Sequence, residues 1–199
     1  MWLVSNKYDR DGARLADGHY SRRTPGSPQF MPPGETIVLV VPGGVAVFGW
    51  WRPDPFACTR LGMRATSGLD GWTCSIFRNP EGTSLRSSDL VLAAERHLAD
   101  AEARGDTHGP CGPDGMLSWV WPRKLKPRPG VEHSNPGWCF QVAGWTRDRW
   151  SSPSVGKGRM KRLLRKPIRL AGVPACDWRP REPIPFVLSA PCPELVCLG

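Results

Sequence analysis

The sequence predicts an α/β (α+β) fold, a mixed, largely antiparallel central sheet with helices packed on it. Two apolar, β-branched runs at 36–41 and 45–51 flank the turn Pro42-Gly43-Gly44, a pattern typical of a β-hairpin. A third run at 72–78 precedes a polar turn and a helical pattern, which indicates strands and helices in one layered domain. The 22 glycines and 22 prolines predict many turns and disfavour a long helical bundle.

The hairpin runs are nearly continuous in apolar residues, so we expect both of their faces to be covered. The helical pattern begins at Ser87 or Ser88, either of which suits the N-cap position, with Asp89 favourable in the first turn. Gly105 ends this pattern, whose apolar face carries Leu90, Ala94, Leu98 and Ala101.

The second half of the chain predicts shorter elements. A strand is expected at 116–121, a short helix at 138–143, and a strand from Trp145. Seven cations and no acid occupy 157–169, where Met160, Leu163 and Leu164 suggest a basic amphipathic turn or two. A last strand is expected at 184–188. We therefore divide the chain into an N-terminal arm and loop packing on the core (1–34), a core (35–150), and a basic element with a Pro-rich tail (151–199), all in one domain.

Charge and cysteine content narrow the class of protein. The net charge of +9 and the pI near 9.6 favour polyanionic partners such as nucleic acid. The seven cysteines include no C-x-x-C pair, so a zinc ribbon is not indicated and reduced thiols in a cytosol are expected.

Neither a signal peptide nor a membrane-spanning run is evident in the sequence. We expect a cytoplasmic protein, in a bacterium or a phage-infected host cell, with no membrane partner.

The turn before the helix is a candidate anion site. Unpaired N–H groups and the helix dipole favour anions at a helix start, and a glycine lets a ligand approach the backbone. The alternative is a well-capped helix after a polar loop. No Walker or G-x-G-x-x-G fingerprint is present. The candidate binding residues here are Gly82, Ser84, Arg86, Ser87 and Ser88.

Two further groups carry candidate catalytic residues. His19 can exchange a proton or bind a metal, and Tyr20 and Ser21 follow it directly. The alternative is a flexible basic arm with an incidental histidine. Arg78 and Asn79 end the 72–78 strand, at the kind of edge where open α/β sheets bind ligands. The alternative there is an ion pair of Arg78 with Glu81 or Asp89.

Cations near tryptophans form a candidate nucleic-acid surface. Cations hold phosphates, and aromatic faces stack an extruded base. The alternative is an ordinary solvated basic face, with most tryptophans in the core. The candidate residues are Arg22, Arg23, Lys124, Lys126, Lys157, Arg159, Lys161, Arg162, Arg165 and Lys166.

The order of strand, anion-cradling turn, helix and strand, followed by the segment 135–145 (NPGWCFQVAGW), resembles the core of the GNAT superfamily of N-acetyltransferases over residues 36–150. In that superfamily the helix after the fourth strand receives the pyrophosphate of acyl-CoA. The resemblance implies a cofactor-binding role for Asn135. The superfamily's Arg/Gln-x-x-Gly-x-Gly/Ala signature is degenerate here, because the turn contains only Gly82.

His19-Tyr20-Ser21, Phe77-Arg78-Asn79 and Ser87-Ser88 are similar to a divergent branch, the phage Mom-type DNA-modification proteins, which decorate adenine. This implies a transferase acting on a nucleic-acid base, most simply adenine in DNA. The expected donor is a small anionic molecule. The resemblance in fold implies acyl-CoA, whereas the altered turn before the helix argues for a different donor. His19 and Tyr20 are candidate ligands should a metal such as iron take part. The alternatives are an ordinary acyl-CoA-dependent N-acyltransferase on a small-molecule or protein amine, and a non-enzymatic basic DNA-binding accessory protein.

Overall fold

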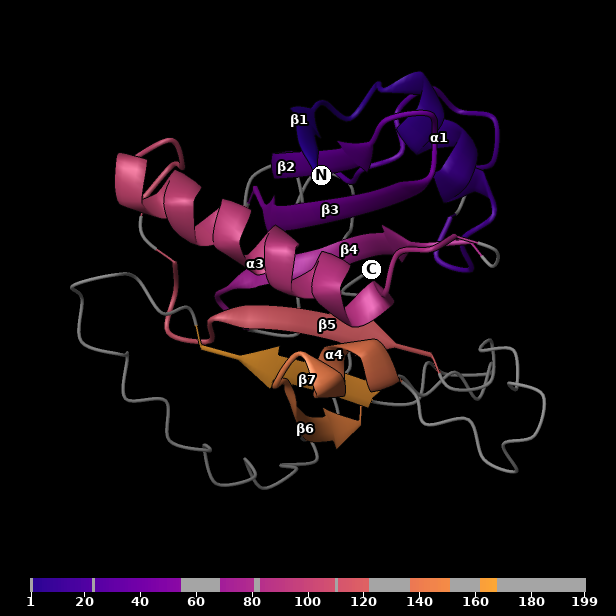
Figure 1. Ribbon diagram of the computed structural model, residues 1–199. Coiled ribbons are helices and arrows are strands. Elements are labelled where there is room, and N and C mark those ends of the chain that lie inside the picture. The colour runs from indigo at the N-terminus through magenta and orange to yellow at the C-terminus, as the bar shows by residue number, and fades with distance from the viewer. Residues whose placement is uncertain are drawn as a thin grey trace, which may run out of the picture.

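A seven-stranded sheet organises the computed structural model, in the order β1-β2-β3-β4-β5-β7-β6 (Figure 1). Neighbouring strands are antiparallel except β4 and β5, which are parallel. The structure describes residues 2–22, 24–54, 69–80, 83–109, 111–121, 137–150 and 162–167. The elements are β1 (Leu3–Ser5), α1 (Arg10–Asp17), β2 (Gly34–Val41), β3 (Ala46–Pro53), β4 (Trp72–Arg78), α3 (Ser87–Arg104), β5 (Met116–Val120), α4 (Trp138–Val142), β6 (Thr146–Trp150) and β7 (Arg162–Lys166).

β2 and β3 form the predicted hairpin, paired from Gly34↔Pro53 to Val41↔Ala46. Its turn places Gly43 and Gly44 at φ 77° and 66°, a left-handed conformation that favours glycine. Val38 and Leu39 belong to different core clusters, one on each side of the sheet. The hairpin is therefore covered on both faces, as its continuous apolar runs predict.

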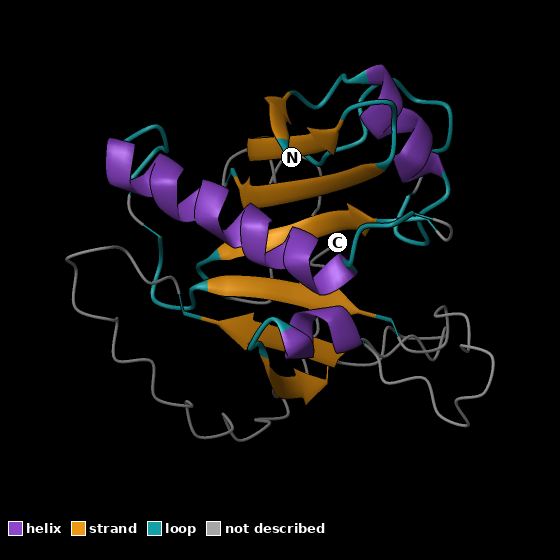
Figure 2. Cartoon of the chain, viewed as in Figure 1, coloured by secondary structure: helices purple, strands orange, loops and turns teal. Residues whose placement is uncertain are grey.

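The helix α3 lies across one face of the sheet (Figure 2) and closely matches its predicted bounds. It ends at Gly105, whose φ of 73° is the left-handed cap conformation. Leu90, Ala94 and Leu98 are fully buried, in one cluster with Phe48 and Trp50 of β3.

Tryptophan indoles also attach α3 to the sheet. Each donates its N–H to α3, which satisfies the polar atom of a large buried ring. These bonds run from Trp2 to the Leu90 carbonyl (3.0 Å), from Trp50 to the Ala94 carbonyl (3.0 Å), from Trp72 to Glu102 Oε1 (2.6 Å) and from Trp145 to Glu95 Oε1 (2.6 Å).

The helix α1, which was not predicted, packs on the opposite face of the sheet against β3 and β4. Its N-cap, Asp9, accepts a hydrogen bond from the Gly12 N–H at 2.7 Å. Ala16 packs with Val47 and Ile76, which face away from α3 because side chains alternate along strands. The apolar stripe of α1 is too narrow to stand out in a polar segment. Residues 1–34, predicted as an arm and loop, thus also contain the strand β1 and the helix α1.

The basic element was predicted wrongly as a helical turn, because its described part, β7, is a strand between β5 and β6. Leu163 and Leu164 are both fully buried. Leu164 joins the α3 cluster, and Leu163 packs with Leu117 in a separate one. Adjacent leucines that pack into different clusters require the two-residue period of a strand.

The predicted strand at 184–188 and most of the 151–199 segment lie outside the described residues. Within the described part of the chain, no helix has the length and apolar character needed to cross a bilayer.

Candidate active site where β4 and β5 separate

β4 and β5 stop pairing halfway along their length. Their parallel ladder covers Trp72↔Met116 to Cys74↔Ser118, after which β4 continues to Arg78 and β5 to Val120 with other partners. We call this place the β4–β5 opening. Parallel strands bring their carboxyl ends to one edge of a sheet, where open sheets commonly bind ligands. Figure 1 shows both arrowheads at the edge where α3 begins.

A bulge in β4 adjoins the opening. Cys74 pairs with Trp50 and Ile76 with Gly49, so Ser75 is an extra residue on β4. Bulges interrupt ladders and are common beside active sites. The Ser75 carbonyl accepts a 3.5 Å hydrogen bond from the Ser21 hydroxyl. The opening is therefore joined directly to the segment that follows α1.

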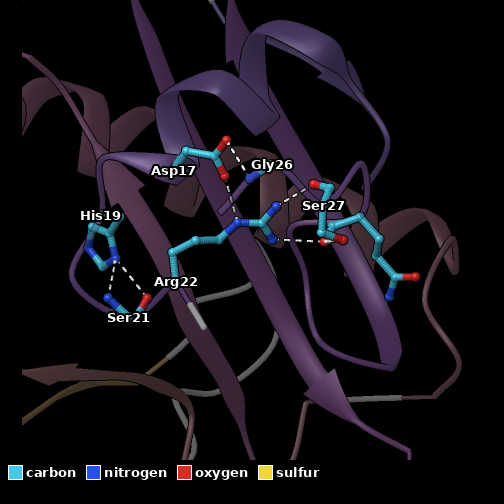
Figure 3. A network of polar contacts seen from close by, with 7 residues as sticks. Asp17, His19, Ser21, Arg22, Gly26 and Ser27 are labelled. Carbon is cyan, nitrogen blue, oxygen red and sulfur yellow. Dashed lines mark hydrogen bonds and ion pairs between the residues drawn. The ribbon is translucent and has the colours of Figure 1, made fainter. Parts of the chain in front are cut away.

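His19 and Ser21 form a tight turn beside the bulge. Ser21 Oγ lies 2.7 Å from His19 Nδ1, and the Ser21 N–H donates to the same nitrogen at 3.3 Å (Figure 3). The His19 N–H bonds to the Ala16 carbonyl at 2.8 Å, which ties the turn to the end of α1. A half-buried imidazole thus lies next to an exposed hydroxyl.

Tyr20 reaches from this turn to β5. Its hydroxyl donates to the Trp119 carbonyl at 3.2 Å and accepts from the Trp121 N–H at 3.4 Å, and its ring lies 4.3 Å from the His19 ring between centroids. Burial raises the pKa of Tyr20 from 10 to about 12, so the phenol is protonated at neutral pH. Tyr20 and Ser21 together connect the two strands across the opening.

A Tyr8→Phe variant isolates the titration of Tyr20, because the chain has two tyrosines. We expect the tyrosinate absorbance of the folded variant to rise around a pKa of about 12. The folded pKa exceeds the ordinary value of 10, so this group's contribution to stability is present below pH 10 and is lost as pH rises through 12. Ionisation near 10 in the folded variant would contradict the buried position of Tyr20.

Arg78 enters from the end of β4. Its guanidinium packs on Gly18, where an added Cβ would lie 3.0 Å from both Cζ and Nη2. In the described part of the chain no ion pair joins Arg78 to an acid, so the expected alternative with Asp89 is not observed, and Glu81 lies outside the described residues. A half-buried cation therefore lies beside Gly18, the residue before His19.

Asn79 organises the turn into α3. Its amide donates to the Leu85 carbonyl at 2.9 Å and to Ser87 Oγ at 3.1 Å, and its carbonyl accepts from Thr83 Oγ1 at 2.8 Å. These bonds give Asn79 a structural role. The predicted serine cap is wrong, because the N-cap is Arg86, whose side chain makes no capping bond.

The first turn of α3 remains a candidate binding segment, although no serine caps it. Ser87 is the first helical residue and its hydroxyl faces Asn79, while Ser84 and Arg86 are exposed and Ser88 is half-buried. Gly82 and Asn135 lie outside the described residues. Since the side chain of the N-cap residue Arg86 makes no capping bond, the first N–H groups of α3 depend on other acceptors.

No protein-family model, curated protein or solved structure matches this chain.

Three predicted phosphate contacts are corrected. Arg22 donates to Asp17 and to two backbone carbonyls, with its side chain 6% exposed. Arg165, also 6% exposed, pairs with Asp114 and Asp148. Lys166 donates to Glu95 Oε2 at 2.6 Å and to the Ala143 carbonyl at 2.5 Å. Charges desolvated in a fold need internal partners, so these cations are engaged within the protein.

The other predicted cations are not tested by the structure. Arg162 lies in β7, but only its backbone is described. The remaining ones, Arg23, Lys124, Lys126, Lys157, Arg159 and Lys161, lie outside the described residues.

Sequence reasoning missed the thiols near Tyr20. Cys74 is buried on β4 next to the bulge, and Cys139, on α4, interacts electrostatically with both Cys74 and Tyr20. Burial raises the pKa of Cys74 well above 9, so its thiol is protonated and unreactive. Among the described residues no three His, Cys, Asp or Glu side chains gather as a metal site. Only the tertiary fold brings Cys74, Cys139 and Tyr20 together.

Proposed function

We propose that this protein is a GNAT-like transferase that modifies a nucleic-acid base, with adenine in DNA as the expected target. The observation that carries the proposal is the convergence at the β4–β5 opening of the His19–Ser21 turn, Arg78 and the start of α3. The His19–Ser21 turn comes from a part of the chain far from Arg78 and α3, which belong to consecutive elements. Proton exchange, a cation and helix N–H groups are the functions that transfer from an anionic donor needs.

The donor side of the proposal rests on α3. In the GNAT superfamily the helix after the fourth strand receives the donor pyrophosphate, and α3 follows the fourth strand, β4. The side chain of its N-cap residue, Arg86, makes no capping bond, and Arg78 lies at the end of the preceding strand. We assign these groups to the anionic part of the donor. The turn has a single glycine, Gly82, and so lacks the full acyl-CoA signature of the superfamily. Experiment must therefore identify the donor.

The acceptor side rests on charge and on His19. A net charge of +9 concentrates polyanions at the surface and favours nucleic acid as the substrate. In the proposed reaction the amine of the base attacks the transferred group, and the bond between that group and the rest of the donor breaks. His19 removes the proton of the amine, and the rest of the donor leaves as an anion with the electron pair of the broken bond, its negative charge stabilised by Arg78. Tyr20 holds the turn between β4 and β5.

The test is to express the protein with plasmid DNA and to analyse the digested nucleosides by mass spectrometry. We expect a mass increase on deoxyadenosine, lost in His19→Ala, Arg78→Ala and Ser87→Ala. Arg14→Ala is the matched control, because its ion pair with Asp11 is exposed on α1. Unmodified nucleosides from cells containing the folded protein would overturn the proposal.

A second candidate is an acyl-CoA-dependent N-acyltransferase on a small-molecule or protein amine. The internal ion pairs of Arg165 and Lys166 favour it, because they remove two cations from the proposed DNA surface. Acyl-CoA retained by the purified protein, with unmodified DNA, would support this candidate. Salt-sensitive DNA binding without bound donor or modified base would instead indicate an accessory protein.

Gly18→Ala tests the role of Arg78 without removing it. The φ of Gly18 is −80°, so alanine fits the backbone, but its Cβ would displace the guanidinium by a few tenths of an ångström. We expect the free energy of unfolding to change by less than about 0.5 kcal/mol, since a flexible side-chain end gives way easily. Base modification should fall several-fold. Unchanged modification would show that the position of Arg78 is not critical.

A further inference from the structure

The side chain of Arg22 holds together the segment that carries His19, Tyr20 and Ser21. Its Nε donates to Asp17 Oδ1 at 2.9 Å, its Nη1 to the Gln29 carbonyl at 2.8 Å, and its Nη2 to the Ser27 carbonyl (Figure 3). The three nitrogens thus reach three different residues. Only a planar guanidinium has donors in this arrangement, because a lysine ammonium is a single point.

These contacts close a short loop around the candidate catalytic residues. Asp17 is the last residue of α1, and the Arg22 N–H bonds to the His19 carbonyl at 3.0 Å. Residues 18–21 therefore lie between two residues that are paired with each other. The second carboxylate oxygen of Asp17 accepts from the Gly26 N–H at 2.9 Å, which attaches the returning chain to the same point.

The Asp17–Arg22 contact is a built feature of the fold. The Arg22 side chain is 6% exposed, whereas the Arg14 side chain of α1 is 69% exposed and pairs with Asp11, three residues before it. The hydrogen bond from Arg22 holds the pKa of Asp17 below its usual range, which agrees with a charged pair. An arginine held in this way is not available to a phosphate.

We propose that Arg22 is a positioning residue for the transfer reaction: with Asp17 it sets the His19–Ser21 turn against the β4–β5 opening. The inference rests on the proposed function for its catalytic consequence. Arg22 acts through His19 and Ser21 and does not touch the substrate. Its loss leaves every candidate catalytic side chain present and changes where the turn places them.

The test compares Arg22→Ala and Arg22→Lys with Arg14→Ala by two readouts. The first is the NMR signal of the His19 imidazole in the folded protein, assigned by its absence in His19→Gln. We expect it to shift in both Arg22 variants and to stay in place in Arg14→Ala. The second is base modification, which we expect to fall about 10²-fold, the loss that a misplacement of about 1 Å produces.

Chemical rescue separates positioning from general destabilisation. Methylguanidinium carries the same planar set of donors as the group that Arg22→Ala removes, so it should restore the His19 signal and part of the modification, while methylammonium should not. Asp17→Asn should shift the same signal, because it removes the charge that holds Arg22. If Arg22→Ala does not fold, the His19 signal and the base modification of Arg22→Lys and Asp17→Asn are compared with those of Arg14→Ala instead.

An unmoved His19 signal in folded Arg22→Ala, Arg22→Lys and Asp17→Asn would overturn the proposal. Full base modification despite a shifted signal would overturn it as well. If the unaltered protein modifies no base, the proposed function fails, and the NMR readout still decides whether Arg22 positions the turn.

Discussion

Glu95→Ala is expected to lower the free energy of unfolding by about 3 kcal/mol or more. Glu95 lies in the middle of α3 with its side chain 10% exposed. One carboxylate oxygen accepts from the Trp145 indole at 2.6 Å, and the other accepts from Lys166 at 2.6 Å. Alanine leaves a buried indole N–H without its acceptor and a largely buried ammonium without a balancing charge, with the Ala143 carbonyl as its remaining acceptor.

Chemical denaturation at neutral pH measures this loss. Asp100→Ala is the matched control, because Asp100 is an exposed acid on the same helix, and its removal should change stability by less than about 0.5 kcal/mol. The free energy of unfolding of Glu95→Gln should lie between those of Glu95→Ala and Asp100→Ala. The amide oxygen of glutamine still accepts one hydrogen bond, but the neutral amide no longer balances the lysine charge. A loss below about 1 kcal/mol in Glu95→Ala would contradict the buried network.

Arg165→Ala is expected to destabilise the protein by about 3–5 kcal/mol, the usual cost of leaving a buried charge unpaired. Arg165 contacts Asp114, 8% exposed, and Asp148, 26% exposed. Asp114 also accepts the Asp70 N–H at 2.7 Å, so it connects β7 to the residues just before β4. Alanine at position 165 removes the cation that balances two carboxylates.

The comparison is with Arg104→Ala, whose ion pair with Asp106 is exposed on both sides. Exposed pairs contribute about 0–1 kcal/mol and are screened by salt, so that variant should stay near the unaltered protein. Arg165→Met combined with Asp114→Asn should recover part of the stability, because neither side then leaves a buried charge. Equal losses in Arg165→Ala and Arg104→Ala would show that the buried pair has no special role.

Elements with strong local signals were predicted closely. The β2–β3 hairpin follows from two β-branched runs around Gly43 and Gly44, and α3 follows from its apolar period and the stop at Gly105. The helix α1 was missed because its buried side consists of small residues such as Gly12 and Ala16. Gly12 lets the Phe30 ring approach to a distance that a Cβ would not allow, and a short-range pattern does not show this.

The candidate site was predicted in its residues and not in its geometry. His19, Tyr20 and Arg78 were each singled out for their chemistry, but only the fold places them at the β4–β5 opening. The roles of Arg22 and Arg165 could not be predicted. A cation in a basic segment looks the same in the sequence whether it faces phosphate or a carboxylate brought near by folding.

The sequence by itself determined the strand–turn–helix from Trp72 to Arg104 and the hairpin before it, because spacing and turn residues act over a few positions. The tertiary structure decided that β4 and β5 separate after Cys74 and Ser118, and that the turn following α1 spans that separation. Tyr20 lies 99 residues from its partner Trp119. Contacts at such separations depend on the packing of the whole sheet, which no local pattern encodes.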